Sequence, residues 1–169
     1  MKRSALFFFV LLATVLATGG AQGAVGDFAR GNFYGVGAGG KCVRVAYDAA
    51  TSSSGTSGTI THTKYKCDGT GTTGDSFSGN VTCLSRTGNR VVLSGPITSK
   101  SGFFAPFTSF REFGFDNSTP SSSTNPDRFF NEGLNGPPDC TGAPPGVFTV
   151  QQGDIRVGGT APSNPGRSL

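Results

Sequence analysis

Residues 77–98, FSGNVTCLSRTGNRVVLSGPIT, contain the clearest strand signal in this chain of 169 residues. Residues 77–86 alternate in the manner of one strand, and residues 90–98 resume a strand pattern after Gly88 and Asn89. Both turn residues tolerate the positive φ angles of a tight hairpin. One face of this first strand is expected to carry Phe77, Gly79, Val81, Cys83 and Ser85. The register stays open, because two-residue and three-residue turns would place opposite faces inward.

A second hairpin is predicted upstream of the first. Residues 41–48 alternate apolar with polar side chains, and residues 59–67 are rich in Thr, Ile and Tyr. A Ser/Gly/Thr-rich stretch separates them, and we place its tip at Ser54 and Gly55. This register would place Cys42 opposite Cys67.

The chain has four cysteines, Cys42, Cys67, Cys83 and Cys140. Three connectivities are possible for four cysteines, and the hairpin register favours Cys42–Cys67 with Cys83–Cys140 as a long-range bridge. Metal binding is the alternative. It is disfavoured because the chain has no Cys-x-x-Cys pair and His62 is its one histidine.

Residues 103–115 are ambiguous between helix and strand. Phenylalanine recurs at intervals of three, which suits a short helical stripe. Gly102, Pro106 and Gly114 disfavour a helix, so we predict a strand. We expect its rings to fill the core of a domain without tryptophan, with an exposed apolar edge as the alternative.

The rest of the chain also predicts strands rather than helices. Residues 28–37 are rich in glycine and suggest an edge-like first strand, and residues 146–157 suggest a last one. Residues 116–126 predict a long polar loop, and residues 135–145 contain four prolines and predict a rigid connector. The expected fold is all-β, an antiparallel sandwich or barrel of about eight short strands, held by disulfides and carrying long polar loops.

The N-terminus has the features of a secretory signal. Lys2 and Arg3 precede the apolar run 5–17, and small residues allow cleavage after Ala21 or Gly23. The run is short for a bilayer span, which disfavours a membrane anchor. We predict a signal peptide at 1–23, a single β domain at 24–158 and a disordered tail at 159–169.

Charge and export limit the classes of partner. Removing Lys2 and Arg3 leaves 12 basic and 10 acidic residues, a net charge of +2, and the basic residues are scattered along the chain. A nucleic-acid partner is therefore not expected. The chain also lacks a lipobox cysteine and an apolar C-terminal tail. We expect a freely secreted protein that has an unknown extracellular partner and does not contact a membrane after signal cleavage.

Several short motifs follow one another in the second half of the chain: GNVTCL (79–84), GNR (88–90), FDN (115–117), PDRF (126–129), PPDC (137–140) and QGDIRV (152–157). In this order they resemble a group of small secreted bacterial β-proteins with no assigned activity. The resemblance covers residues 79–157. It implies that cysteines matching Cys83 and Cys140 recur in the group, that Cys42 and Cys67 are an addition here, and that no catalytic residue is carried over.

His62 is the candidate general base, because a Ser-His-Asp arrangement needs a histidine between nucleophile and carboxylate. Asp48 lies on the same predicted hairpin, but the chain has no Gly-x-Ser-x-Gly elbow. We therefore interpret His62 as a solvated strand residue among threonines.

Carboxylate chemistry has two further candidates. Glu112 and Glu132 are the chain's glutamates and would be needed, with aspartates, for glycoside hydrolysis, but tryptophan platforms are absent. The loops after the Phe-rich segment contain several side chains with the hard oxygen atoms that calcium prefers: Asp116, Asn117, Asp127 and Asp139. Their spacing does not match an EF-hand loop, and such residues also cap turns, so no metal or cofactor is predicted.

The sequence thus predicts a secreted, non-enzymatic β-domain that binds or packs against something outside the cell. The alternative is a small secreted hydrolase that uses His62 or an Asp pair. A third hypothesis is a structural component that assembles through its Phe-rich edge.

Overall fold

The computed structural model describes residues 24–117 and 124–159, so the predicted signal peptide and residues 160–169 of the predicted tail lie outside it. The described residues form an all-β fold with two single-turn 3-10 segments, η1 (Ala38–Gly40) and η2 (Gly102–Phe104). The strands are β1 (Phe28–Val36), β2 (Cys42–Ser52), β3 (Gly55–Tyr65), β4 (Thr72–Asn80), β5 (Cys83–Thr87), β6 (Arg90–Ser101), β7 (Ser109–Phe115), β8 (Arg128–Leu134) and β9 (Phe148–Gly158).

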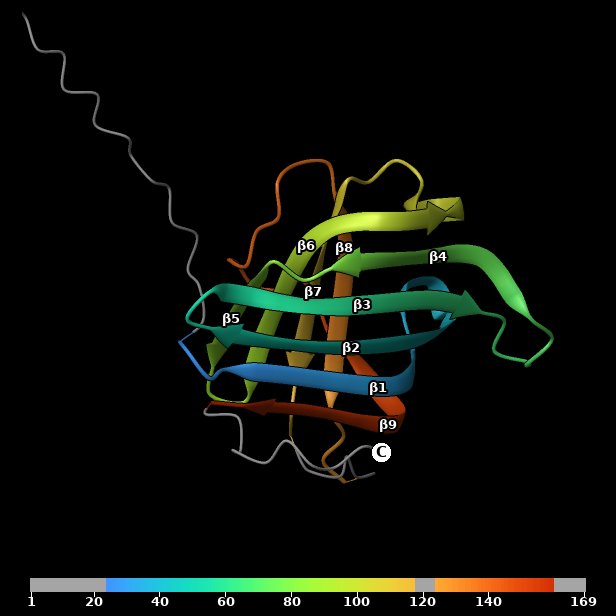
Figure 1. Ribbon diagram of the computed structural model, residues 1–169. Helices are drawn as coiled ribbons and strands as arrows, with labels where there is room; N and C mark the ends of the chain where they lie inside the picture. Colours follow the sequence, from blue (N-terminus) through green and yellow to red (C-terminus); the bar gives the residue numbers. More distant parts are fainter. Residues whose placement is uncertain (1–23, 118–123, 160–169) are drawn as a thin grey trace, which may run out of the picture.

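The strands close into a barrel. Their order is β4-β3-β2-β1-β9-β8-β7-β6-β5, every pairing is antiparallel, and an additional pairing of β4 with β6 completes a ring of eight strands with β5 outside it. The barrel is flattened into two layers (Figure 1), in which β1–β4 and β9 cross in front of β5–β8. The prediction of an antiparallel all-β fold is therefore confirmed in its barrel form.

The hairpin predicted around Gly88 and Asn89 forms with a two-residue turn, because Thr87 pairs with Arg90. The single strand predicted for residues 77–86 is wrong. Strand β4 ends at Asn80, and the Val81 N–H still donates to the Gly58 carbonyl of β3, but the Thr82 N–H donates to the Ser94 carbonyl of β6, along which the chain continues as β5. This break inverts the alternation, so that Leu84 is buried in the barrel.

The β2–β3 hairpin turns one residue earlier than predicted. Ser52 pairs with Gly55, which places Tyr65 rather than Cys67 opposite Cys42. Cys67 lies just beyond the end of β3 and still reaches Cys42 to form a disulfide. Both predicted disulfides, Cys42–Cys67 and Cys83–Cys140, are confirmed.

The prediction of an edge-like first strand is wrong, since β1 lies between β2 and β9. Its glycines have a packing role instead. A Cβ on Gly31 would lie 2.5 Å from the Tyr47 ring, and one on Gly35 would lie 2.4 Å from the Phe129 ring. Glycine on the inner face of β1 therefore leaves room for large rings from other strands.

The barrel interior is filled mainly by aromatic rings and aliphatic side chains. Its buried phenylalanines are Phe33, Phe77, Phe104, Phe110 and Phe129. The predicted strand within residues 103–115 is confirmed as β7, which the short turn η2 precedes. A core without tryptophan is thus built from rings that pack against glycines and each other.

A second, smaller core lies on the outer face of the back layer. Val92, Phe113 and Cys140 are buried there and pack against partly buried side chains. The Pro-rich connector between β8 and β9 covers this face and is held by the Cys83–Cys140 disulfide. Strand β6 is therefore buried on both faces near its start.

Candidate functional site

His62 lies inside the barrel rather than in solvent, so its interpretation as a solvated histidine is wrong. The register of β3 places it on the same inner face as Ile60. Its ring stacks on Phe77 at a centroid distance of 5.3 Å and meets the edge of Phe104 at 5.1 Å. Neither ring nitrogen has a hydrogen-bond partner among the described residues, and burial lowers the pKa of His62 to about 3.

The predicted neighbour Asp48 lies on the opposite face of the same wall. It is exposed and pairs with Arg30, whose Nε lies 3.3 Å from its Oδ1. The structure therefore does not bring Asp48 to His62. Within the described part of the chain, this neutral imidazole has no oriented proton acceptor or donor beside it, which general base catalysis requires.

The two glutamates also lie on opposite faces of their wall. Glu112 is fully buried in the interior, where neither carboxyl oxygen has a partner in residues 24–117 and 124–159, and burial raises its pKa well above the usual value. Glu132 faces outward and accepts a bond from Arg111 Nε at 2.7 Å. The paired carboxylates of a glycosidase are therefore not formed by these residues.

Two further interior groups were not singled out from the sequence. The Tyr47 hydroxyl and Asn131 Nδ2 are buried and, like Glu112, have no hydrogen-bond partner within the described structure. Asn131 is directly opposite Glu112 on the neighbouring strand. Burial, and then the charge of Glu112, raises the pKa of Tyr47. Strand register creates this polar set, and no local motif marks it.

The aspartates that were weighed as candidate calcium ligands accept hydrogen bonds from backbone groups or from Arg111. Asp127 accepts the Asn117 N–H at 2.9 Å and the Ile155 N–H at 2.8 Å, and Asp116 accepts the Val157 N–H at 3.0 Å. Asp139 lies elsewhere, against Arg111. In residues 24–117 and 124–159, no three His, Cys, Asp or Glu side chains are arranged to hold a metal ion.

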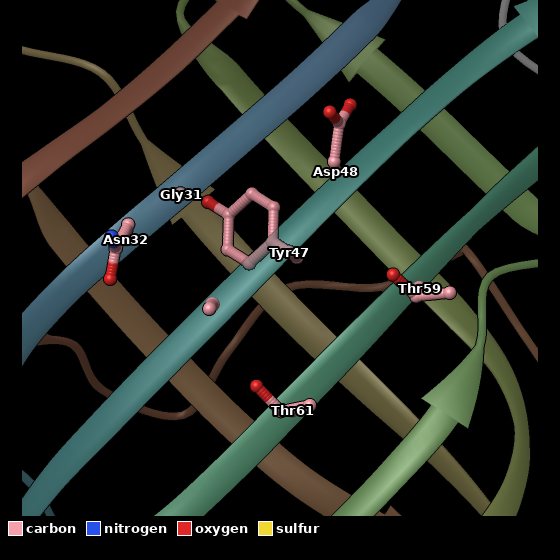
Figure 2. Close-up of a pocket in the computed structure, with 7 residues that line it drawn as sticks. Gly31, Asn32, Tyr47, Asp48, Thr59 and Thr61 are labelled. Atoms are coloured by element: carbon pink, nitrogen blue, oxygen red, sulfur yellow. The ribbon is translucent and has the colours of Figure 1, made fainter. Parts of the chain in front are cut away.

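The outer face of the front layer has a shallow depression (Figure 2), lined by Gly31, Asn32, Ala46, Tyr47, Asp48, Thr59 and Thr61. These residues come from β1, β2 and β3. Asn32, Thr59 and Thr61 are exposed on this face, and they offer hydrogen bonds to a neutral polar ligand. The depression is wide open to solvent, so it does not desolvate a bound group.

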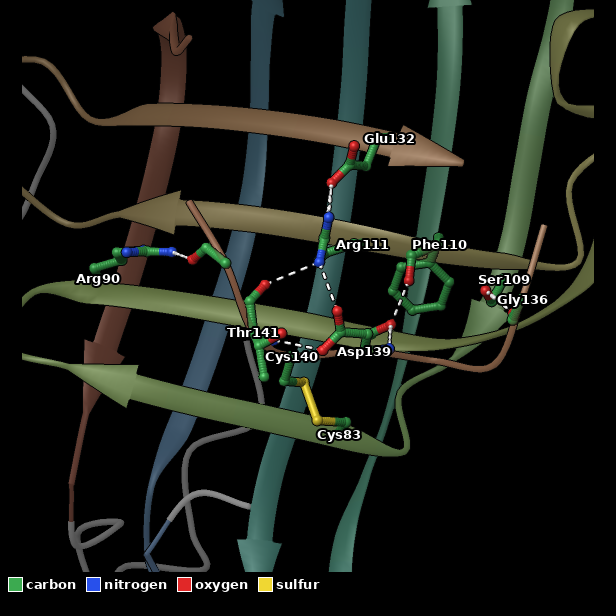
Figure 3. Close-up of polar contacts among 12 residues, drawn as sticks. Cys83, Arg90, Ser109, Phe110, Arg111, Glu132, Gly136, Asp139, Cys140 and Thr141 are labelled. Atoms are coloured by element: carbon green, nitrogen blue, oxygen red, sulfur yellow. Dashed lines mark hydrogen bonds and ion pairs between the residues drawn. A yellow bond between two sulfur atoms is a disulfide. The ribbon is translucent and has the colours of Figure 1, made fainter. Parts of the chain in front are cut away.

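A polar network on the outer face of the back layer binds the Pro-rich connector to the sheet (Figure 3). Arg111 donates from Nη1 to Asp139 at 2.9 Å and to the Thr141 carbonyl at 2.9 Å, while its Nε bonds Glu132. Hydrogen bonds from Thr141, followed by the charge of Arg111, lower the pKa of Asp139. These contacts hold the connector on the sheet and have a structural role.

The most exposed aromatic ring of the described residues lies between β6 and β7, in residues 102–107 (GFFAPF), which we call the phenylalanine turn. Phe104 is 2 % exposed and packs into the barrel, whereas Phe103 is 58 % exposed. Asp75 Oδ1 accepts the Phe103 N–H at 2.9 Å, and this bond is the largest cause of the lowered pKa of Asp75. The expectation that these rings fill the core is right for Phe104 and wrong for Phe103.

Comparison with protein-family models, with curated proteins and with solved structures finds no match for this chain. The resemblance to small secreted bacterial β-proteins therefore stays a prediction. Among the residues that the structure describes, no helix is long and apolar enough to cross a membrane.

Proposed function

We propose that this protein is an extracellular, non-enzymatic binding domain that contacts its partner through the phenylalanine turn. The signal-like N-terminus supports export, and two disulfides suit an oxidising compartment. The closed barrel supplies a rigid support for the turn at the junction of two strands.

The observation that carries this proposal is an exposed ring on a fixed backbone. Phe103 follows Gly102, whose φ of 57° suits glycine, and its N–H is held by Asp75. Phe104 anchors the turn in the interior. An apolar side chain fixed in an exposed position loses little conformational entropy on binding, and such preorganisation favours an interaction site.

The interior groups favour binding over catalysis. His62 and Glu112 are the most strongly perturbed acid–base side chains that a hydrolase would use, and both are enclosed without a hydrogen-bonded partner among the described residues. His62 has no exposed surface, and its ring is packed against Phe77 and Phe104. The hydrolase alternative therefore has no supporting geometry around these two residues in the described structure.

Retention on cells tests the proposal. Purified mature protein is mixed with washed bacterial cells, and the fraction that sediments is compared for the parent, Phe103→Ser and Val25→Ser. Val25 is a matched control because it is 67 % exposed and lies at the opposite end of the barrel. We expect Phe103→Ser to reduce retention and Val25→Ser to leave it unchanged.

A parallel activity screen separates the two hypotheses. The parent and His62→Phe are assayed with chromogenic ester, peptide and glycoside substrates. Turnover by the parent that His62→Phe abolishes, with the fold intact by circular dichroism, would refute the non-enzymatic proposal. Equal retention of the parent and Phe103→Ser on cells would refute the role of the turn.

A further inference from the structure

The fold gathers the lysines that are scattered in the sequence. The described residues contain four lysines, Lys41, Lys64, Lys66 and Lys100. Lys41 precedes β2, Lys64 and Lys66 flank the last residue of β3, and Lys100 is near the end of β6. The start of β2 pairs with the end of β3, and the start of β4 joins the ends of β3 and β6. All four lysines therefore lie at one end of the barrel.

The phenylalanine turn lies at this same end, since η2 directly follows β6. Lys64 Nζ lies 4.1 Å from the centre of the Phe103 ring and 3.8 Å from Asp75 Oδ2. Lys100 Nζ donates to the Phe107 carbonyl at 2.5 Å. Two of the lysines thus contact the turn, and Lys64 places its positive group beside the exposed ring.

The other two lysines are exposed on the rim. Lys41 and Lys66 each precede a cysteine of the Cys42–Cys67 disulfide, which holds them close to one another. The acidic residues near this end are Asp75, which is bonded within the turn, and the exposed Asp68. Cationic groups therefore outnumber anionic groups around the turn.

The turn itself is apolar throughout. Residues 102–107 contain no polar side chain, and Gly102, Phe103, Ala105 and Pro106 are exposed. An exposed apolar patch that is rimmed by charged residues is a feature of surfaces that bind a protein or a membrane. An apolar tip surrounded by lysines is amphipathic, which is the character of segments that bind at a bilayer interface.

We propose that this end of the barrel docks on the surface of an anionic phospholipid bilayer. Phe103 would enter the interface while the exposed Lys41 and Lys66 contact the negative headgroups. This inference rests on the proposed binding role of the turn, and it departs from the expectation that the secreted protein does not contact a membrane. Lipid is favoured over a soluble anionic polymer because the exposed ring is phenylalanine in a wholly apolar turn, which gains from leaving water.

A single introduced tryptophan tests the inference, because the chain has none. Phe103→Trp is mixed with vesicles of equimolar phosphatidylglycerol and phosphatidylcholine, and with vesicles of phosphatidylcholine alone. We expect a blue shift of tryptophan emission with the anionic vesicles and none with the neutral ones. Val25→Trp, at the opposite end of the barrel, should show no shift with either.

The lysines are tested without disturbing the turn. Lys41→Gln combined with Lys66→Gln, in the Phe103→Trp background, removes two exposed charges and leaves Lys64 and Lys100 in place. At about 1 kcal/mol for each lysine near an anionic surface, we expect about a thirtyfold loss of vesicle affinity. Added salt should weaken the binding of the unaltered reporter in the same direction.

Three results would overturn the inference. These are no emission shift of the Phe103→Trp variant with anionic vesicles, an equal shift from Val25→Trp, or a shift with soluble polyphosphate as large as that with vesicles. If vesicles fail while Phe103→Ser still loses retention on cells, the lipid is the wrong partner and the binding role stands. If both assays fail, the binding role fails with it.

Discussion

The front and back layers of the barrel use the same pleated alternation but treat their outer faces differently. In the front layer the outer face of β3 is bare and carries Thr59, Thr61 and Thr63. In the back layer the outer face buries Val92 and Phe113 beneath the connector. One closed sheet can therefore be covered by a second layer of chain on one side and remain open to solvent on the other.

The two layers also differ in the titratable group that each contributes to the interior. The front layer contributes His62, and the back layer contributes Glu112. Burial disfavours the charged form of both, which lowers the pKa of His62 and raises the pKa of Glu112. Buried His62 therefore lowers the stability of the fold in acid, and buried Glu112 lowers it as the pH rises.

Removing each disulfide gives the largest expected contrast between the layers. The bridges close loops of 57 and 25 residues, for which chain entropy predicts contributions of about 4 and 3.5 kcal/mol. The double variant Cys83→Ser/Cys140→Ser should lose more stability, relative to Cys42→Ser/Cys67→Ser, than the two loop lengths predict. It also releases the connector from the outer core of Val92 and Phe113. Urea unfolding of each double Ser variant measures the two losses. A larger loss for Cys42→Ser/Cys67→Ser would contradict this account of the back layer.

Acid unfolding isolates the contribution of His62. Its pKa is about 3 when folded and 6.5 when exposed, so the unfolded chain binds the proton first as the pH falls below 6.5. By pH 4 this difference costs about 3 kcal/mol. His62→Phe should recover most of that stability at pH 4 relative to pH 7, as measured by denaturant unfolding at both pH values. The same pH dependence in the parent and the variant would show that His62 is not buried.

Glu112 should act in the opposite direction. Its folded pKa is raised, so the unfolded chain loses its proton first once the pH rises above the usual value of 4.5. Stability falls by about 1.4 kcal/mol for each pH unit until the folded carboxyl ionises. Glu112→Gln should remove this decline between pH 5 and pH 7 in thermal unfolding curves. Glu112→Asp serves as the control, since it keeps the titration.

Surface substitutions give the smallest effects and separate the covered face from the bare one. Arg111→Met removes two ion pairs from a side chain that is 17 % exposed and should cost about 1–2 kcal/mol. Thr61→Val on the bare face should change stability by less than about 0.5 kcal/mol. Chemical denaturation compares the two variants. Equal losses would mean that the connector contributes nothing to the back layer.

The sequence predicted the parts of the fold that depend on neighbours along the chain. The Gly88-Asn89 turn and a strand within residues 103–115 follow from local turn chemistry and alternation. Both disulfides were favoured by a hairpin register that lies two residues from the observed one. The break after Asn80 and the central position of β1 were missed. Each depends on pairing with strands far away in the chain, which local patterns do not encode.

The candidate site was predicted less well. The apolar composition of residues 102–107 was visible in the sequence, but whether Phe103 or Phe104 entered the core was not. His62 was misassigned because threonines surround it along the chain, while phenylalanines surround it in space. The lysine cluster was missed because its members come from three separate strands or their ends.

The amino-acid order alone determined that this chain forms strands and that phenylalanine supplies the core, and it favoured one cysteine pairing among three. Those properties follow from backbone preference, turn residues and apolar area. Tertiary structure alone decided which side of each strand faces inward and which charges meet at one end. The pairing that closes the barrel sets which face is buried, because a shift of one residue in pairing exchanges the buried face for the exposed one. The same pairing brings the charged ends of separate strands together.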